Sequence, residues 1–338
     1  MNRRTGLITL LVLVALGAMA YLAASLGSRM GLVTLEIGWP QLWADGGDGV
    51  LSAVIANLRV PRVAAAILTG ASLAVAGLLL QGVSRNPLAD PFLLGISGGA
   101  GLAVVVLHAI PGLIETLGWW CVPVAAFVGA QLATMLVLAV ARGPGGRMTM
   151  LGLILGGVII NSFCAAITTF LLVSFAPLQL RITTMWLAGG VGYVDWSHLA
   201  GAFVAFCAAF VFIRFRSSDL NAFALGEEGA LLVGVDSHRL VRESAWTASL
   251  LTGLAVSMAG MVGYIGLIVP HLVRLVVGND FKSTLVLSAL VGALLLLVGD
   301  TAARTVMAPQ EIPVGVLAAI IGTPLLLVLI KRELGGTR

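Results

Sequence analysis

The feature that most restricts the fold is an uncharged segment, Val63–Ser84, which follows two arginines on either side of Pro61. At 1.5 Å per residue, a helix of this length crosses a bilayer core of roughly 30 Å. Similar apolar runs recur along the chain. Of the 338 residues, 59% are hydrophobic and only 10% are charged, whereas about a quarter are charged in a soluble domain. Most of the chain is therefore predicted to lie in lipid.

Apolar windows of spanning length predict an all-α membrane protein, with residues 1–338 forming one transmembrane domain of about ten helices. The expected helices are Gly6–Leu26, Val60–Ser84, Pro91–Ile110, Trp119–Ala141, Met148–Ser174, Trp196–Phe215, Val241–Ile265, Val269–Gly278, Ser283–Thr301 and Val314–Lys331. The eighth is too short to span alone, so we expect a half-depth helix covered by its neighbours. Leu178–Tyr193 is expected to form a short helix at the outer surface. The first window could be a cleaved signal peptide, but its length favours a retained helix.

The distribution of positive charge predicts which loops face the cytoplasm. With both termini inside, most of the 19 Lys and Arg residues fall on the cytoplasmic side. These are Arg3, Arg4, Arg85, Arg142, Arg147, Arg214, Arg216, Arg239, Arg242, Arg274, Lys282, Lys331, Arg332 and Arg338. The exceptions expected outside are Arg29, Arg59, Arg62, Arg181 and Arg304. This asymmetry supports an even number of spans, and it singles out the outer arginines for explanation.

A weak internal repeat indicates two related halves. Thr69-Gly70 and Ala76-Gly77 in the second expected helix recur, at one constant offset, in the seventh. The same offset relates Arg59 to Arg242, Pro87 to Pro270 and Gly95 to Gly278. Because five helices separate the copies, they would cross the membrane in opposite directions, as in transporters built from inverted repeats. Chance matching among Gly and Ala is the alternative.

Several chemistries have no signature in this chain. There is no GxxxxGK[ST] motif, and neither lysine follows a glycine, so no P-loop is present and we do not expect an enzyme. The three cysteines and four histidines are dispersed, and we assign no metal site to them. No feature points to nucleic acid. A secondary transporter driven by an ion gradient usually keeps ionisable residues at mid-membrane depth. Their scarcity here favours an external energy source, with the secondary transporter as the alternative.

The largest cytoplasmic segment, Arg214–Arg242, is where such energy could enter. Within it, Leu225–Val235 is typical of a short amphipathic helix, with acidic residues in its first turn and a terminating glycine. Its apolar face could enter a groove on a soluble partner, although an ordinary surface helix fits the pattern equally well. The residues concerned are Leu225, Gly226, Glu227, Glu228, Ala230, Leu231, Leu232 and Gly234.

Beyond these patterns, the chain resembles the FecCD-type permeases of type II ABC importers, which take up iron-siderophore chelates, haem and vitamin B12 (cobalamin). The resemblance runs from Arg59 onward. It rests on Arg59-Val60-Pro61-Arg62, Gln81-Gly82, Arg85 to Pro91, Leu225-Gly226-Glu227, Gly263 to Leu267 with Pro270-His271 and Arg274, and Glu311-Ile312-Pro313-Val314-Gly315. Two departures are mild: Tyr264 replaces the usual Phe, and Gly190 stands where Ser is common.

The resemblance implies a vitamin-B12-permease-like fold in the cytoplasmic membrane, paired with a second permease subunit, as a homodimer or a heterodimer. Two cytoplasmic ATPase subunits, which carry ATP and Mg, would dock on the helix at Leu225–Val235. An extracytoplasmic substrate-binding protein would dock through carboxylates on Arg59, Arg62 and Arg304. An arginine fork suits such pairing, although arginines at helix ends also snorkel. Asn86, Pro87 and Leu88 would form a cytoplasmic gate, and Asn86 could also cap the third helix.

The remaining motif residues are expected to be structural. Pro270, His271 and Arg274 recur in the family irrespective of substrate, so His271 is not expected to bind haem. Glu311, beside Pro313 and Gly315, is expected to bond the backbone or Arg304, with a cation-binding role less favoured. The sequence does not separate siderophore, haem and cobalamin, and family frequency favours an iron chelate.

Overall fold

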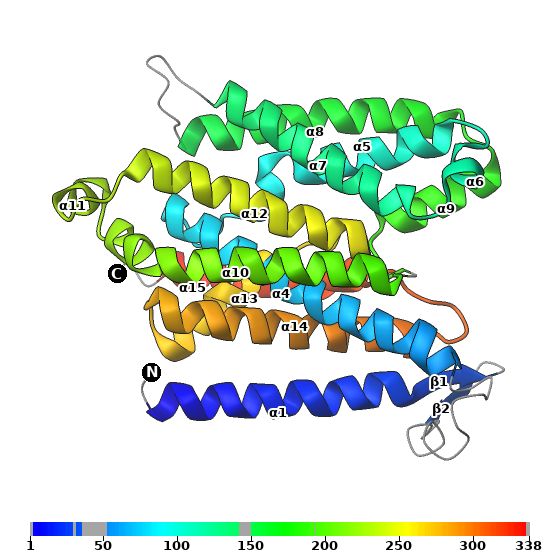
Figure 1. The fold of residues 1–338 in the computed structure, drawn as a ribbon, viewed down its shortest axis with the longest axis horizontal. Coiled ribbons are helices and arrows are strands. Elements are labelled where there is room, and N and C mark those ends of the chain that lie inside the picture. Colours follow the sequence, from blue (N-terminus) through cyan, green and yellow to red (C-terminus); the bar gives the residue numbers. More distant parts are fainter. Residues whose placement is uncertain (1–2, 30–31, 36–52, 142–149, 193, 336–338) are drawn as a thin grey trace.

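The structure is a computed structural model, and it describes residues 3–29, 32–35, 53–141, 150–192 and 194–335. Each of the ten expected helices coincides with a helix (Figure 1). These are α1 (Arg3–Ser25), α4 (Val60–Ser84), α5 (Ile96–Ala109), α7 (Cys121–Val140), α8 (Met150–Val173), α10 (Trp196–Ala224), α12 (Ser237–Ala259), α13 (Ile265–Val277), α14 (Phe281–Thr305) and α15 (Val314–Gly335). In the described chain, six helices are individually long and apolar enough to cross a membrane, and three shorter apolar helices join them.

Short elements connect these helices. They are a π-helical turn η1 (Ile55–Arg59), a 3-10 turn η2 (Pro91–Leu94), α6 (Leu113–Leu117), α9 (Pro177–Leu187) and α11 (Glu227–Leu232). The all-α prediction is confirmed for the body of the molecule. A small antiparallel ribbon of β1 (Leu26–Arg29) and β2 (Leu32–Leu35) follows α1 and was not predicted.

The short elements lie at opposite ends of the bundle (Figure 1). α11 and the beginning of α1 lie at one end, which we call the inner end. β1, β2, α6 and α9 lie at the other, which we call the outer end. Arg59 belongs to the outer end, because its Nη1 donates to the carbonyl oxygen of Ala24 in the last turn of α1. The predicted inner helix and the predicted outer arginine are therefore on opposite sides.

α4 is the central helix of the bundle. In its most hydrophobic stretch 89% of the residues are buried inside the protein, against 11% for α1. It crosses its neighbours at glycines: a Cβ added to Gly70 would overlap the backbone of Gly292 in α14, and one added to Gly77 would overlap Gly266 in α13. Small residues of this kind let helix backbones approach closely in lipid.

The packing supports an inverted repeat. α4 and α12 lie side by side and run in opposite directions (Figure 1). α4 packs on α13 and α14, and α12 packs correspondingly on α5 and α7. Two of the five sequence matches do not fit this relation, because Pro87 lies in the turn after α4 whereas Pro270 lies inside α13, and Gly95 precedes α5 whereas Gly278 follows α13.

Some helix boundaries differ from those expected. α10 continues nine residues past Phe215 because its charged extension is paired: Arg216 bonds Asp219 and also Glu243 of α12. The seventh helix ends at Ala259, since Gly260 has a positive φ of 61°. The eighth helix begins at Ile265, before the expected start at Val269. Gly95, with φ 77°, divides the third expected helix into η2 and α5.

α13 shows how its proline is accommodated. Pro270 has no N–H, so the carbonyl of Gly266, one turn earlier, lacks its helical donor. Gln81 of α4 supplies one: its Nε2 donates to Gly266 O at 3.3 Å and to Leu267 O at 3.0 Å. Arg274 in turn donates to Gln81 Oε1. This half-length helix is thus covered by α4, as irregular backbone at membrane depth requires.

Candidate functional site

The three arginines predicted for docking meet where α1 ends, α4 begins and α14 ends. Arg62 makes two hydrogen bonds to Asp300 Oδ1, from Nη2 at 3.0 Å and from Nε at 3.3 Å. It also grips Glu311 with both ends of its fork, Nη1 to Oε1 at 3.2 Å and Nη2 to Oε2 at 3.0 Å. Among the described residues, Glu311 therefore bonds Arg62, whereas the sequence suggested Arg304 or the backbone.

Asp300 is the centre of this cluster, and its side chain is only 1% exposed. Its second oxygen lies 3.2 Å from Nε of Arg304, one helical turn further along α14. Arg304 Nη2 donates to the carbonyl of Ala23 at 3.2 Å. The carbonyls of Ala23 and Ala24 belong to the last turn of α1, where no helical donors remain. The arginines thus cap α1 as well as neutralise Asp300.

The motif around Pro313 and Gly315 packs by its backbone at the same end. The N–H of Gly315 donates to Gly189 O at 3.0 Å, and a Cβ at Gly315 would overlap the carbonyl of Ala188. Gly189 itself has φ 79° and approaches the backbone of Met261. Two motifs far apart in the sequence therefore form one close contact at the start of α15.

The predicted gate, Asn86-Pro87-Leu88, forms a tight turn at the inner end. Arg85 ends α4 in a left-handed conformation with φ 49°. The side-chain oxygen of Asn86 accepts from the N–H of Leu88 at 2.9 Å, which closes an Asx turn. The idea that Asn86 caps the third helix is wrong, because Asp90 does so, accepting from Phe92 N at 2.8 Å.

Asp90 is partly buried beside this turn. Burial raises its pKa to about 6, against a smaller opposing effect from the hydrogen bond of Phe92 N–H. The pKa of Asp280, at the start of α14, shifts in the opposite direction. Burial is outweighed there by hydrogen bonds from Ser283, Asn221 and the backbone, so its pKa is lowered.

The predicted inner helix forms as α11, which is shorter than the expected Leu225–Val235. Glu227 and Glu228 occupy its first turn, Ala230 is fully buried, and Gly234 follows with φ 82°. Apolar side chains nevertheless face outward: Leu225 is 85% exposed and Leu232 is 89% exposed, and Leu231 and Val233 are exposed beside them. An apolar surface of this kind marks a contact with a partner or with lipid.

The end of α10, which leads into α11, contacts the residue that precedes the gate turn. The guanidinium of Arg85 lies 5.9 Å from the ring centroid of Phe223, at the end of α10, within reach of a cation–π interaction. Next to it, Asn221 donates to Asp280 Oδ1 at 3.0 Å and accepts from Phe281 N at 2.9 Å. The end of α10 is thereby joined to both the turn after α4 and the start of α14.

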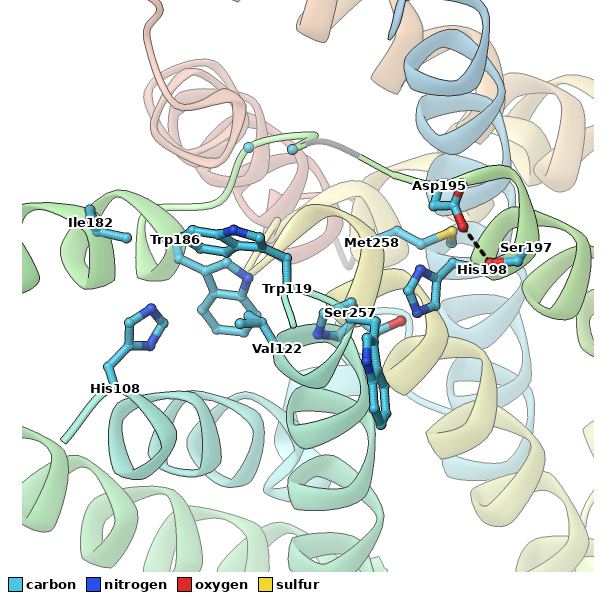
Figure 2. A pocket seen from close by; sticks show the side chains of 14 residues that line it. His108, Trp119, Val122, Ile182, Trp186, Asp195, Ser197, His198, Ser257 and Met258 are labelled. Atoms are coloured by element: carbon cyan, nitrogen blue, oxygen red, sulfur yellow. Dashed lines mark hydrogen bonds between the residues drawn. The ribbon is translucent and has the colours of Figure 1, made fainter. Parts of the chain in front are cut away.

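A cavity of about 770 Å³ opens among α7, α9, α10 and α12 near the outer end. Figure 2 shows His108 on one side, Trp119 and Trp186 in the middle, and Asp195 bonded to Ser197 on the other. His198 also lines this cavity, beside Ser197.

The histidines are dispersed in the sequence, and no motif spacing predicts that His108 and His198 line the same cavity. No group of three or more His, Cys, Asp or Glu side chains in the described residues could hold a metal ion.

The sequence did not single out Asn161. It lies inside α8, accepts from Gly98 N at 2.9 Å and donates to Phe92 O at 3.0 Å, which joins α8 to the start of α5.

These observations define a multi-pass membrane protein, with polar clusters at its two ends and with its central helices α4 and α12 running in opposite directions. The chain matches the FecCD transport family over residues 7–332. It belongs to that family, whose members include permease subunits of ABC importers.

Named relatives cover nearly the whole chain. The chain is 36% identical to the hemin transport system permease protein HmuU of Yersinia pestis, over 97% of this chain and 94% of the relative. It is 35% identical to the cobalamin import system permease protein BtuC of Halobacterium salinarum, over 94% and 88%. A solved structure described as an inward-facing metal-chelate type ABC transporter superposes with a TM-score of 0.82 at 27% identity, covering 96% of this chain and 99% of that one.

Asp300→Asn is expected to destabilise the protein by about 3 kcal/mol, because Arg62 and Arg304 would lose their buried counter-charge. The matched change Asp219→Asn removes a more exposed partner, 31% exposed, and should cost less than about 1 kcal/mol. Thermal unfolding of both purified variants measures the difference. Equal stability of the two variants would contradict the central role of Asp300.

Asp90 and Asp280, both at the inner end, should make the stability of the protein depend on pH in opposite directions. Asp90 has a folded pKa raised from 3.8, so the parent protein loses stability as pH rises from about 4 to about 6. Asp90→Asn should therefore be more stable than the parent, by about 1–3 kcal/mol above pH 6, with the gain shrinking toward pH 4.

Asp280→Asn is the control, because its effect on stability should have the opposite sign to that of Asp90→Asn. The lowered pKa of Asp280 stabilises the parent at neutral pH and ceases to do so as pH falls through that pKa. Unfolding temperatures of the parent and both variants between pH 4 and 8 test the pair. Parallel curves for the parent and Asp90→Asn would refute the shifted pKa of Asp90.

Proposed function

We propose that this chain forms, with a second copy, the membrane pathway of an ATP-driven importer for a bulky metal chelate of the siderophore, haem or cobalamin kind. The named relatives, which include hemin and cobalamin permeases, support this substrate class. The observation that carries the proposal is the exposed apolar surface of α11, opposite the arginine cluster. Both termini then lie in the cytoplasm, on the side of α11, and segment 214–242 faces the ATPases.

Energy enters at α11 in this proposal. In each permease copy, α11 offers apolar surface to a groove on one of the two ATPase subunits, in the helix-in-groove mode. The side chains concerned are Leu225, Leu231, Leu232 and Val233. Closure of the ATPases on ATP moves α11, and the Arg85–Phe223 contact carries the movement to the turn Asn86–Leu88. That turn, paired with its copy in the second subunit, opens and closes the path on the cytoplasmic side.

The substrate arrives from outside in this proposal. A substrate-binding protein loaded with the chelate docks at the outer cluster of Arg59, Arg62 and Arg304 and releases its ligand between the two permease subunits. The three arginines outnumber the two carboxylates, Asp300 and Glu311, so this cluster has a net positive charge, which suits acidic groups on the docking protein. Pro270, His271 and Arg274, near the inner end, keep a structural role.

ATP-dependent uptake tests the proposal. Proteoliposomes holding the permease with its ATPase, with the binding protein added outside, should take up one of three labelled probes, a ferric siderophore, haem or cobalamin, only when ATP is supplied. Leu232→Glu should reduce uptake at least tenfold, because a charge would face the apolar groove of the ATPase. Leu178→Glu, which alters a 70% exposed leucine at the outer end, is the control. Uptake driven by an ion gradient without ATPase would select the secondary transporter instead.

Docking is tested by ATP hydrolysis. Binding protein should stimulate the ATPase of the parent complex, and Arg59→Glu should remove most of that stimulation because like charges would meet. Arg181→Glu makes the same charge change at an exposed outer position and should retain it. Full stimulation of the folded Arg59→Glu complex would reject the docking surface.

A further inference from the structure

The fork of Arg62 already holds a carboxylate in the isolated subunit. Glu311 contacts it with both oxygens, in the bidentate geometry by which arginine recognises carboxylates generally. A carboxylate from another protein cannot occupy the same face of the fork while Glu311 remains there.

The two carboxylates on Arg62 have different environments. The side chain of Asp300 is 1% exposed and lies between Arg62 and Arg304, so it stays in place. The side chain of Glu311 is 56% exposed, and it can turn into water without uncovering a buried charge. Arg62, 21% exposed, would remain neutralised on its inner side by Asp300.

We propose that Glu311 is an internal substitute for the carboxylate of the docking protein, and that docking proceeds by exchange of one carboxylate for the other on Arg62. This inference rests on the docking surface proposed above. Arg304, 13% exposed and bonded to Ala23 O, then acts as a positioning residue that holds Asp300 and the end of α1. The partner that Arg62 fits is an acidic side chain on a lobe of the docking protein.

The exchange has a physical consequence for affinity. Each docking event must break one exposed ion pair before it forms another, so the gain from the new pair is partly cancelled. Exposed ion pairs contribute little individually, which keeps docking weak and reversible. A transport cycle needs that property, because the binding protein must leave after it releases its ligand.

Glu311→Gln tests the exchange, because it preserves shape and weakens the internal competitor. The probe is the ligand-loaded binding protein that stimulates the parent complex, and its Kd is measured by surface plasmon resonance on permease in nanodiscs. Glu311→Gln is expected to lower the Kd about two- to fivefold, the range that an exposed pair spans. Glu115→Gln, an equal charge change on the exposed outer helix α6, should leave the Kd unchanged.

The other outcomes are equally decisive. A higher Kd for Glu311→Gln would mean that Glu311 orients Arg62 for the partner, and an unchanged Kd would mean that the two carboxylates do not compete. Either result overturns the exchange while leaving the docking surface intact. A parental Kd for Arg59→Glu in the same measurement would instead refute the docking surface itself. If Glu311→Gln unfolds, Glu311→Asp, which shortens the reach to Arg62, should lower the Kd in the same direction.

Discussion

Backbone-to-backbone contact at glycines holds this bundle together. Inside lipid, burying an apolar side chain against another helix gains little, because the hydrocarbon chains are equally apolar. Helices must instead gain close van der Waals contact. α4 does so against α14 at Gly70 and Gly292 and against α13 at Gly77 and Gly266. α5 and α7 repeat the arrangement at Gly99 and Gly129.

Three polar side chains within this packing have particular partners. Gln81 replaces the donor that Pro270 lacks, Asn161 bonds the first turn of α5, and Asp300 pairs with two arginines. An unsatisfied group at membrane depth would cost several kcal/mol, roughly as much as the whole margin of stability of some proteins. These side chains therefore fix how the helices are aligned along their axes, whereas the glycines fix how closely they approach.

The sequence predicted the ten principal helices well, since hydropathy is a property of local segments. Two of the five matches behind the predicted repeat, at Pro87 and Gly95, did not fit the structure. It did not predict that Arg62 meets Asp300 and Glu311, because that pairing depends on how α4 and α14 cross. It assigned Asn86 to a cap that Asp90 provides, since both residues have the right chemistry and only the turn geometry separates them. His108 and His198 share a cavity for the same reason: tertiary packing brings them together.

The glycine contacts of α4 also determine which parts of the molecule can move. Where carbonyl oxygens face glycines, any sliding of one helix along the other would place a side chain against backbone. α4, α13 and α14 therefore behave as one rigid block. The long outer helix α10 lacks such a contact: only 22% of its most hydrophobic stretch is buried, and a Cβ at its glycine, Gly201, would meet no atom within 4 Å. Side chains therefore make its contacts, and it can tilt or rotate more freely than α4. Movement in such a molecule is expected to concentrate at the surface helix α10 and in the turns at the helix ends, while the points where α4 crosses α13 and α14 keep their alignment.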